Sequence, residues 1–295
     1  MAGTIVDRGA GHFVEWTRIG TLTLGSSGPI RRCGFGTAWL TGPGTFGPPP
    51  DRDAAVAVLR RAADAGVQLF DTADCYGPAI IEELVAEALH PYSDDIVVST
   101  KGGRFALGDN RWRADGRPEH LKAACEASLR RLRVDSIALY QLNAVDPDVP
   151  LPESLGALVE LRDAGKIREI GVCNVDEDEL EVARTCAPIV SVQDRFDVLT
   201  REREGVLDAC ARNGIVFLPW FPPSTAENAP AGSALQRIST RRDVPASQVA
   251  LAWLLARSPW VLPLPGSAEQ KRYELDLAAL DLELTDDEVA ELTVG

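Results

Sequence analysis

The chain has 295 residues, 45% of them hydrophobic and 25% charged, so it is long enough for a large core and has a globular composition. Its formal net charge of -14 would repel nucleic acid and anionic membranes, and we expect neither as a partner. The sequence has no signal-peptide pattern and no apolar run near the roughly 20 residues of a membrane helix.

Two features precede the main repeat. We expect residues 1–14 to form a loose tail. Residues 17–32 alternate between polar and apolar side chains around a Gly-Ser-Ser-Gly turn, which predicts a β-hairpin. A short strand at 33–39 follows, and then a helix that opens at Asp51 and closes at Gly66.

Short apolar strands and amphipathic helices then alternate to the end of the chain. The predicted strands are 33–36, 67–71, 96–101, 137–142, 167–172, 189–193, 215–220 and 260–266. The predicted helices are 51–66, 118–133, 153–164, 176–186 and 202–213. This alternation predicts a parallel sheet covered by helices. Eight strands close a TIM (β/α)8 barrel, so we predict that fold, with the N-terminal hairpin, as one domain over residues 1–295.

A doubly wound α/β sheet is the alternative that the same pattern allows. That fold needs an early G-x-G-x-x-G turn for a dinucleotide phosphate. The sequence Gly-Phe-Gly-Thr-Ala-Trp at 34–39 does not match this motif, which favours the barrel.

The run at 69–77 is an apolar strand that ends abruptly in polar side chains able to do chemistry. Tyr76 lies five residues after Asp71, and both can meet Lys101 from the next strand. A nearby ammonium stabilises a phenolate, and a carboxylate can hold that ammonium in place. The structural alternative is an aspartate that caps a turn and a tyrosine that packs under a loop.

Catalytic residues of a barrel lie at the carboxyl ends of its strands. The chain places several polar or aromatic residues at predicted strand ends: Asp71, Lys101, Asn143, Asn174, Gln193 and Trp220. Their coincidence predicts an active site at this end.

Five motifs resemble, in the same order, those of the aldo-keto reductase superfamily. They are DTADCYG at 71–77, STKGG at 99–103, GKIREIGVCN at 165–174, SVQDRF at 191–196, and QVALAWLLARS with LPLPG at 248–266. The resemblance, closest to bacterial monomer-type barrels, implies that Tyr76 donates a proton to a carbonyl oxygen, assisted by Lys101 and Asp71. The family's catalytic histidine is replaced by Asn143, whose amide donates a hydrogen bond but does not titrate.

The same resemblance implies NADPH as the cofactor. Asn174 and Gln193 match the ligands of the nicotinamide carboxamide, and Trp220 matches the aromatic residue that stacks on the nicotinamide ring. Other residues at cofactor positions are Thr37, Phe221, Gly266, Ser267, Arg272 and Asp276. Because a guanidinium suits a 2′-phosphate, Ser267 and Arg272 favour NADPH over NADH.

The substrate site is less legible in the sequence. Trp39, after the first strand, and Trp112, in the loop at 102–118, are expected to roof it and to favour an apolar or ring-shaped substrate. Three arginines of that loop, Arg104, Arg111 and Arg113, either bind a carboxylate or phosphate or are simply solvated.

We therefore expect an NADPH-dependent oxidoreductase that transfers hydride to an aldehyde or ketone of a small organic substrate. A role in specialised metabolism is a guess from Asn143. Two alternatives stay open: reduction of a polarised C=C or C=N bond, and a slow or non-catalytic NADPH-binding regulatory protein, since potassium-channel beta subunits of this superfamily share the asparagine.

Six cysteines without metal-like spacing predict a reduced, cytoplasmic protein without a metal site. The sequence leaves the oligomeric state open.

Overall fold

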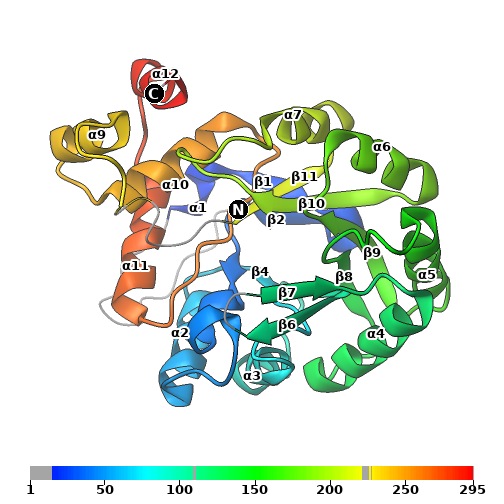
Figure 1. The fold of residues 1–295 in the computed structure, drawn as a ribbon. Coiled ribbons are helices and arrows are strands. Elements are labelled where there is room, and N and C mark those ends of the chain that lie inside the picture. The colour runs from blue at the N-terminus through cyan, green and yellow to red at the C-terminus, as the bar shows by residue number, and fades with distance from the viewer. Residues whose placement is uncertain (1–14, 109–110, 221–225, 227, 295) are drawn as a thin grey trace, which may run out of the picture.

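The computed structural model describes residues 15–108, 111–220, 226 and 228–294. Seven parallel strands form one curved sheet in the order β11-β10-β9-β8-β5-β4-β3, with helices outside it (Figure 1). The strands are β3 (Phe35–Gly36), β4 (Leu69–Asp71), β5 (Val97–Gly102), β8 (Ile137–Leu142), β9 (Ile167–Cys173), β10 (Ile189–Arg195) and β11 (Val216–Trp220). This arrangement confirms the predicted barrel.

The eighth predicted strand, at 260–266, is an extended segment rather than a regular strand. It forms an isolated parallel bridge to β11. On its other side, the N–H groups of Gly34 and Gly36 donate to the carbonyl oxygens of Pro263 and Pro265, both at 3.0 Å. The two prolines have no N–H to return, so the hydrogen-bond ladder stays incomplete although the barrel is closed.

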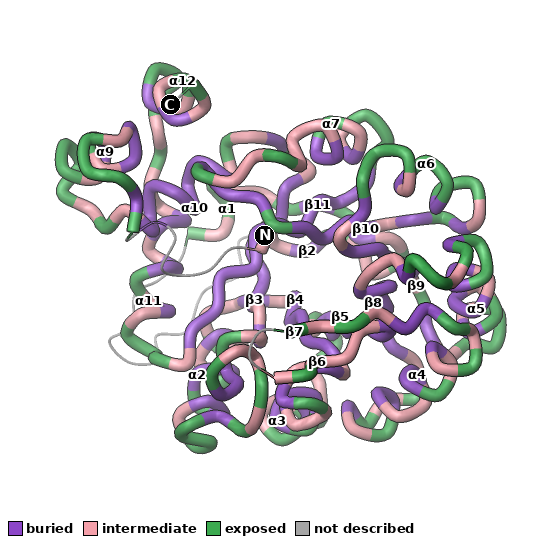
Figure 2. The backbone as a smooth tube through the Cα atoms, in the orientation of Figure 1, coloured by how far each residue is buried: buried purple, intermediate pink, exposed green. Residues whose placement is uncertain are grey.

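Most of the helices bury one face and expose the other, as the burial pattern in Figure 2 shows, but the helix at 246–257 is buried continuously from 247 to 254. The helices are α2 (Arg52–Asp64), α3 (Ile80–Leu89), α4 (Pro118–Leu132), α5 (Leu151–Asp163), α6 (Glu177–Cys186), α7 (Glu204–Asn213), α9 (Ala234–Arg242), α10 (Ala246–Arg257), α11 (Gln270–Ala278) and α12 (Asp286–Val294). As predicted, α2 starts at Asp51, whose carboxylate accepts the Ala54 N–H at 2.9 Å. Among the described residues, no helix is both long and apolar enough to cross a bilayer.

The N-terminal hairpin closes the floor of the barrel. Its strands β1 (Thr21–Thr23) and β2 (Pro29–Arg31) are antiparallel, and the short helix α1 (Trp16–Ile19) takes the place of the first predicted hairpin residues. Apolar side chains of this segment share a buried cluster with barrel residues near the starts of the strands: Leu22, Leu24, Ile30, Leu69, Val97, Leu139, Val216 and Leu262. The amino end of the barrel is therefore packed with hydrocarbon.

Several further parts of the fold differ from the sequence prediction, and among them are the helices α9, α10, α11 and α12, which were not predicted. The predicted loop at 102–118 contains two antiparallel strands, β6 (Arg104–Gly108) and β7 (Arg111–Ala114). Strand β6 is largely half-buried without alternation, and β7 alternates between exposed and half-buried over only four residues. Helix α3 was not predicted, and it starts after Ala79, which has a left-handed φ of 67° and no side-chain cap. The usual start signal of a helix is therefore missing there. The predicted tail, 1–14, lies outside the described residues.

Candidate active site

A cavity of about 660 Å³ opens at the carboxyl ends of the strands. Many predicted site residues from separate strands and loops line it together: Thr37, Trp39, Asp71, Tyr76, Trp112, Asn143, Asn174, Gln193 and Trp220. The barrel thus collects side chains up to 183 positions apart in the sequence, from Thr37 to Trp220, around one volume.

The remaining predicted residues lie elsewhere. Lys101 is fully buried behind Asp71 and Tyr76. Gly266 ends the closing segment, where a Cβ would overlap the carbonyl oxygen of Gly36, so this close approach requires glycine. Ser267 is buried and accepts the N–H of Glu269 at 3.0 Å.

Arg272 and Asp276 belong to α11, where Arg272 is half-buried and Asp276 is buried. Neither Arg272 nor Asp276 is among the described residues that line the cavity. Phe221 lies outside the described residues. The cofactor roles of these three positions, and of Gly266 and Ser267, stay predictions.

Lys101 contacts three groups of the segment 71–76. Its Nζ donates to Asp71 Oδ2 at 2.5 Å, to the carbonyl oxygen of Thr72 at 2.9 Å and to the Tyr76 hydroxyl at 3.5 Å. The ammonium also lies 5.1 Å from the centre of the Tyr76 ring. Strand β5 places Lys101 next to β4, which ends at Asp71, because the two strands are neighbours in the sheet. The structure therefore brings the predicted phenol, amine and carboxylate together.

A layer of polar side chains under this group holds Asp71 in place. Asp71 Oδ1 accepts from Ser99 Oγ at 2.9 Å and from Gln141 Nε2 at 3.0 Å. Gln141 Oε1 in turn accepts from Ser191 Oγ at 3.4 Å. The sequence analysis missed these three residues, although each lies two positions before a predicted one. Alternate residues of a strand share a face, so that spacing was the available signal.

Gly171 leaves room for this layer inside the barrel. A Cβ at this position of β9 would overlap Ser191 Oγ and lie 2.9 Å from Cγ of Gln141. An alanine there would push apart two members of the network that fixes Asp71.

Burial shifts the pKa values of Tyr76 and Lys101 in opposite directions. It raises the pKa of Tyr76 to about 12, although the charge of Lys101 acts in the opposite direction. Sequence spacing indicates the effect of Lys101 on this pKa, but the larger effect of burial depends on the surrounding atoms. Burial alone would lower the pKa of Lys101, but the negative charge of Asp71 outweighs it and raises that pKa above its ordinary range. At neutral pH the pair is thus a protonated phenol beside an ammonium.

Asn143 is buried at the cavity wall, where the family histidine was expected. Its Nδ2 donates to Cys75 Sγ at 3.4 Å, and its backbone oxygen accepts from Asn174 Nδ2 at 2.8 Å. Because a side-chain amide has two N–H groups, one is left to donate toward the cavity.

The residues expected around the nicotinamide fit that group. Gln193 is buried and lines the cavity, and its Nε2 has no hydrogen-bond partner among the described residues. An unpaired buried amide is costly, and a carboxamide oxygen would satisfy it. Asn174 adopts a left-handed φ of 56°, a conformation that asparagine tolerates better than most residues.

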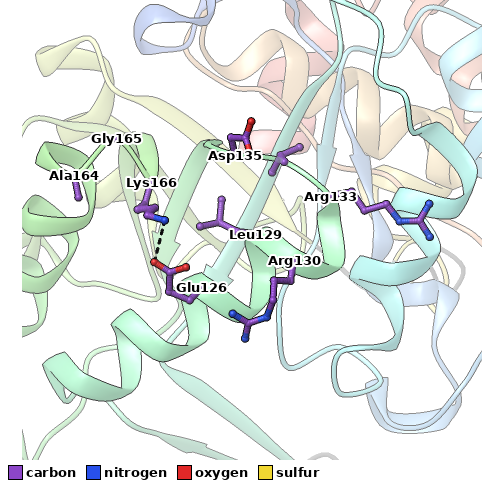
Figure 3. Close-up of a pocket in the computed structure, with 9 residues that line it drawn as sticks. Glu126, Leu129, Arg130, Arg133, Asp135, Ala164, Gly165 and Lys166 are labelled. Carbon is purple, nitrogen blue, oxygen red and sulfur yellow. Dashed lines mark ion pairs between the residues drawn. The ribbon is translucent and has the colours of Figure 1, made fainter.

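A second hollow, of about 520 Å³, lies at the amino ends of β8 and β9, by the end of α4 (Figure 3). Its Lys166 pairs with Glu126 at 3.3 Å, and the side chain of Arg133 points away from that pair. The cations of this hollow do not converge, so we assign it no ligand. Within the described part of the chain, no three His, Cys, Asp or Glu side chains are grouped to hold a metal ion.

The chain is similar to known reductases along almost its whole length. A model of the aldo/keto reductase family matches residues 32–294. An uncharacterised oxidoreductase of Schizosaccharomyces pombe is 36% identical over 283 residues, which cover 96% of this chain and 92% of that protein. Pyridoxine 4-dehydrogenase of Escherichia coli is 37% identical over 284 residues, 92% of this chain and 96% of the relative.

Solved structures agree with the sequence matches. The crystal structure of an aldo-keto reductase from Klebsiella pneumoniae in complex with NADPH superposes with a TM-score of 0.76 at 26% identity, over 92% of this chain and 93% of the other. These matches confirm the superfamily that the motifs resemble and the predicted barrel. The chain belongs to the aldo/keto reductase family of oxidoreductases.

Proposed function

We propose that the protein binds NADPH and reduces the carbonyl group of an aldehyde or ketone. The proposal is carried by one observation: a protonated phenol, Tyr76, lies 3.5 Å from the buried ammonium of Lys101 at the wall of the cavity. When bound, NADPH supplies the hydride for the carbonyl carbon. The NADPH complex of the Klebsiella relative supports this choice of cofactor.

In this proposal Tyr76 donates its phenolic proton to the carbonyl oxygen. The ammonium of Lys101 stabilises the phenolate that is left, and Asp71 keeps the ammonium charged and in place. A positioned general acid contributes about 10²- to 10⁴-fold to a rate. Asn143 supplies a second, neutral donor to the same oxygen.

The cofactor is held by residues of the cavity and of α11. Asn174 and Gln193 bind the carboxamide, and Trp220 packs on the nicotinamide ring. Ser267 and Arg272 bind the 2′-phosphate, which gives the preference for NADPH. The unpartnered Nε2 of buried Gln193 supports the first of these assignments.

Pyridoxal is the first substrate to test. The E. coli relative is named pyridoxine 4-dehydrogenase, and pyridoxal carries at position 4 the aldehyde that corresponds to the alcohol of pyridoxine. The aromatic walls provided by Trp39 and Trp112 suit a flat ring.

Deuterium labelling tests the proposed reaction. NADPH deuterated at the transferable position is incubated with the protein and pyridoxal or a benzaldehyde, and the product is analysed by mass spectrometry and NMR. We expect one deuterium on the carbinol carbon. Label at a former C=C or C=N carbon in a matched substrate panel, without carbinol product, would contradict carbonyl reduction.

A slow, nucleotide-binding regulatory protein is the second candidate. The hydrogen bond from Asn143 to Cys75 favours it, because the side-chain amide that is expected to donate to the substrate already donates to a protein sulfur atom. The variant Asn143→His separates the two candidates. A large gain in aldehyde turnover over a wild type that binds NADPH but scarcely turns over would support the second.

We also propose a cytoplasmic location. All six cysteines are free, and five of them are buried, which suits a reducing compartment. Fractionation of the native source tests it, and recovery in an oxidising compartment would overturn it.

A further inference from the structure

We infer that Arg104 binds an anionic oxygen group of the substrate, so that the preferred carbonyl compounds carry a carboxylate or phosphate on a flat ring. This inference deepens the proposed function and depends on it for the identity of the reacting group. In this inference Arg104 contacts a substrate group that lies away from the reacting carbonyl.

The charges in the cavity lining support the inference. Among the described lining residues, Asp71 and Arg104 are the charged ones. Asp71 is neutralised by Lys101 at 2.5 Å. In the described part of the chain the side chain of Arg104 forms no ion pair or hydrogen bond, so its positive charge is left for a ligand, on a protein whose formal net charge is -14.

The side chain of Arg104 is held in place by stacking. Its guanidinium carbon lies 4.6 Å from the centre of the Trp112 ring, and Trp112 also lines the cavity. A guanidinium that stacks on its flat face keeps the N–H donors at its edge available, and this edge matches a carboxylate or phosphate. The stack therefore provides a preformed anion contact beside an aromatic wall.

The charge of Arg104 also reaches the reacting end of the cavity. Burial raises the pKa of the Cys75 thiol strongly, and the charge of Arg104 acts against this effect. The same holds for Cys173. Tyr76 and Arg104 both line the cavity of about 660 Å³, so one small molecule can present its carbonyl to Tyr76 and its anion to Arg104.

The other two arginines of β6 and β7 behave differently. Arg111 and Arg113 are exposed and do not line the cavity, although Arg113 stacks on Phe105 at 5.4 Å. The three arginines could not be distinguished from the sequence, but in the structure only Arg104 lines the cavity. Arg113 is also a matched control, because it shares the β6–β7 pair and the stacking but not the cavity.

The test compares anionic substrates with neutral partners. The pairs are 4-carboxybenzaldehyde with 4-carbamoylbenzaldehyde, and pyridoxal 5′-phosphate with pyridoxal. We expect the ratio of kcat/KM, anionic over neutral, to fall about 10- to 100-fold in Arg104→Gln, which is the range of a charge-assisted hydrogen bond. Arg104→Lys should lose part of the ratio, and Arg113→Gln should keep it. The pair with the larger loss identifies carboxylate or phosphate as the group bound.

Two results would overturn the inference. One is an unchanged ratio in Arg104→Gln for both pairs. The other is an equal fall of kcat/KM for both members of each pair that accompanies a loss of NADPH affinity, since Arg104 would then be a cofactor contact. NADPH affinity is measured in the same variants by quenching of protein fluorescence.

A binding experiment keeps this test separate from the proposed reaction. Calorimetry compares 4-hydroxymethylbenzoate with 4-hydroxymethylbenzamide on the protein saturated with NADPH. If no aldehyde is reduced but the carboxylate is preferred and Arg104→Gln abolishes that preference, carbonyl reduction fails and the anion contact stands. Equal binding of both compounds to the wild type would overturn the anion contact alone.

Discussion

Two buried ion pairs lie on opposite faces of β5, one facing the cavity and one facing the helices. Inside the barrel, Lys101 and Asp71 approach to 2.5 Å. Outside it, Arg131 of α4 and Glu82 of α3 approach to 2.6 Å, and Thr100 donates to the same glutamate, also at 2.6 Å. Thr100 and Lys101 are sequence neighbours, and successive residues of a strand point to opposite faces.

The two pairs are alike in distance and differ in their surroundings, and this difference separates the pair that we propose to be catalytic from the structural one. Glu82 is fully enclosed by protein partners that tie α3 and α4 to the sheet. Lys101 instead keeps a contact with the hydroxyl of Tyr76 at the cavity wall. A buried ion pair is by itself weak evidence of stabilisation, so each pair has to be tested by removing one partner.

The variant Lys101→Met should have the largest effect. It leaves the carboxylate of Asp71 buried without its partner, which costs about 3–5 kcal/mol of unfolding free energy. It also removes the cation beside Tyr76, so we expect kcat to fall about 10²- to 10⁴-fold. Urea denaturation and NADPH oxidation measure the two effects.

A matched control for this variant is Lys122→Met. Lys122 forms an exposed pair with Glu160 at 2.5 Å, and such surface pairs contribute about 0–1 kcal/mol. The control should keep both stability and rate. Near-normal turnover by Lys101→Met would remove Lys101 from the mechanism.

The variant Glu82→Gln should separate stability from rate. Glutamine keeps acceptor and shape but leaves the guanidinium of Arg131 without its counter-charge, so we expect a loss of about 1–3 kcal/mol in unfolding free energy. The cavity is unchanged, and kcat should stay within about threefold, as for sites that do not share partners. A fall in kcat comparable to that of Lys101→Met would erase the distinction between the two pairs.

Another expected effect, confined to stability, is a dependence on pH that comes from Asp74. Burial first, and then the charge of Glu82, raise the pKa of Asp74 to about 8. In the unfolded chain this carboxyl titrates near ~4. Between these values the folded protein holds a proton that the unfolded chain has released, so the unfolding free energy falls as pH rises, by at most about 1.4 kcal/mol per pH unit.

The variant Asp74→Asn tests this linkage. Its unfolding free energy should fall less steeply from pH 5 to pH 8 than that of the wild type, and Glu82→Gln should weaken the slope in part. Urea titrations at several pH values measure the slopes. Identical slopes in wild type and Asp74→Asn would show that Asp74 is ionised in the folded protein.

Much of the fold could be predicted from the sequence, because buried parallel strands appear in it as short apolar runs. The exceptions have local causes. Pro263 and Pro265 remove the N–H groups that an eighth strand needs, and Ala79 gives α3 no capping side chain. Strand β6 is largely half-buried and lacks a clear period, and strand β7 alternates over only four residues.

Residues of the candidate site could be predicted from the sequence mainly where they lie at the ends of predicted strands. Residues one step deeper, such as Ser99 and Gln141, form the network around Asp71 but carry no motif. The depth of burial that sets the pKa of Tyr76 depends on surrounding atoms and not on sequence spacing. The role of Arg104 could not be predicted from the sequence either, because Arg111 and Arg113 lie in the same stretch of sequence and only the structure shows that Arg104 alone of the three lines the cavity.

The most direct test of the central claim is the turnover of Tyr76→Phe, measured with saturating NADPH and a reducible aldehyde. The substitution removes one oxygen and keeps the ring that packs beside Lys101. We predict that kcat falls at least about 10²-fold while NADPH affinity stays near that of the wild type. Turnover within a few-fold of the wild type would show that the proton comes from another group and would contradict the proposed mechanism.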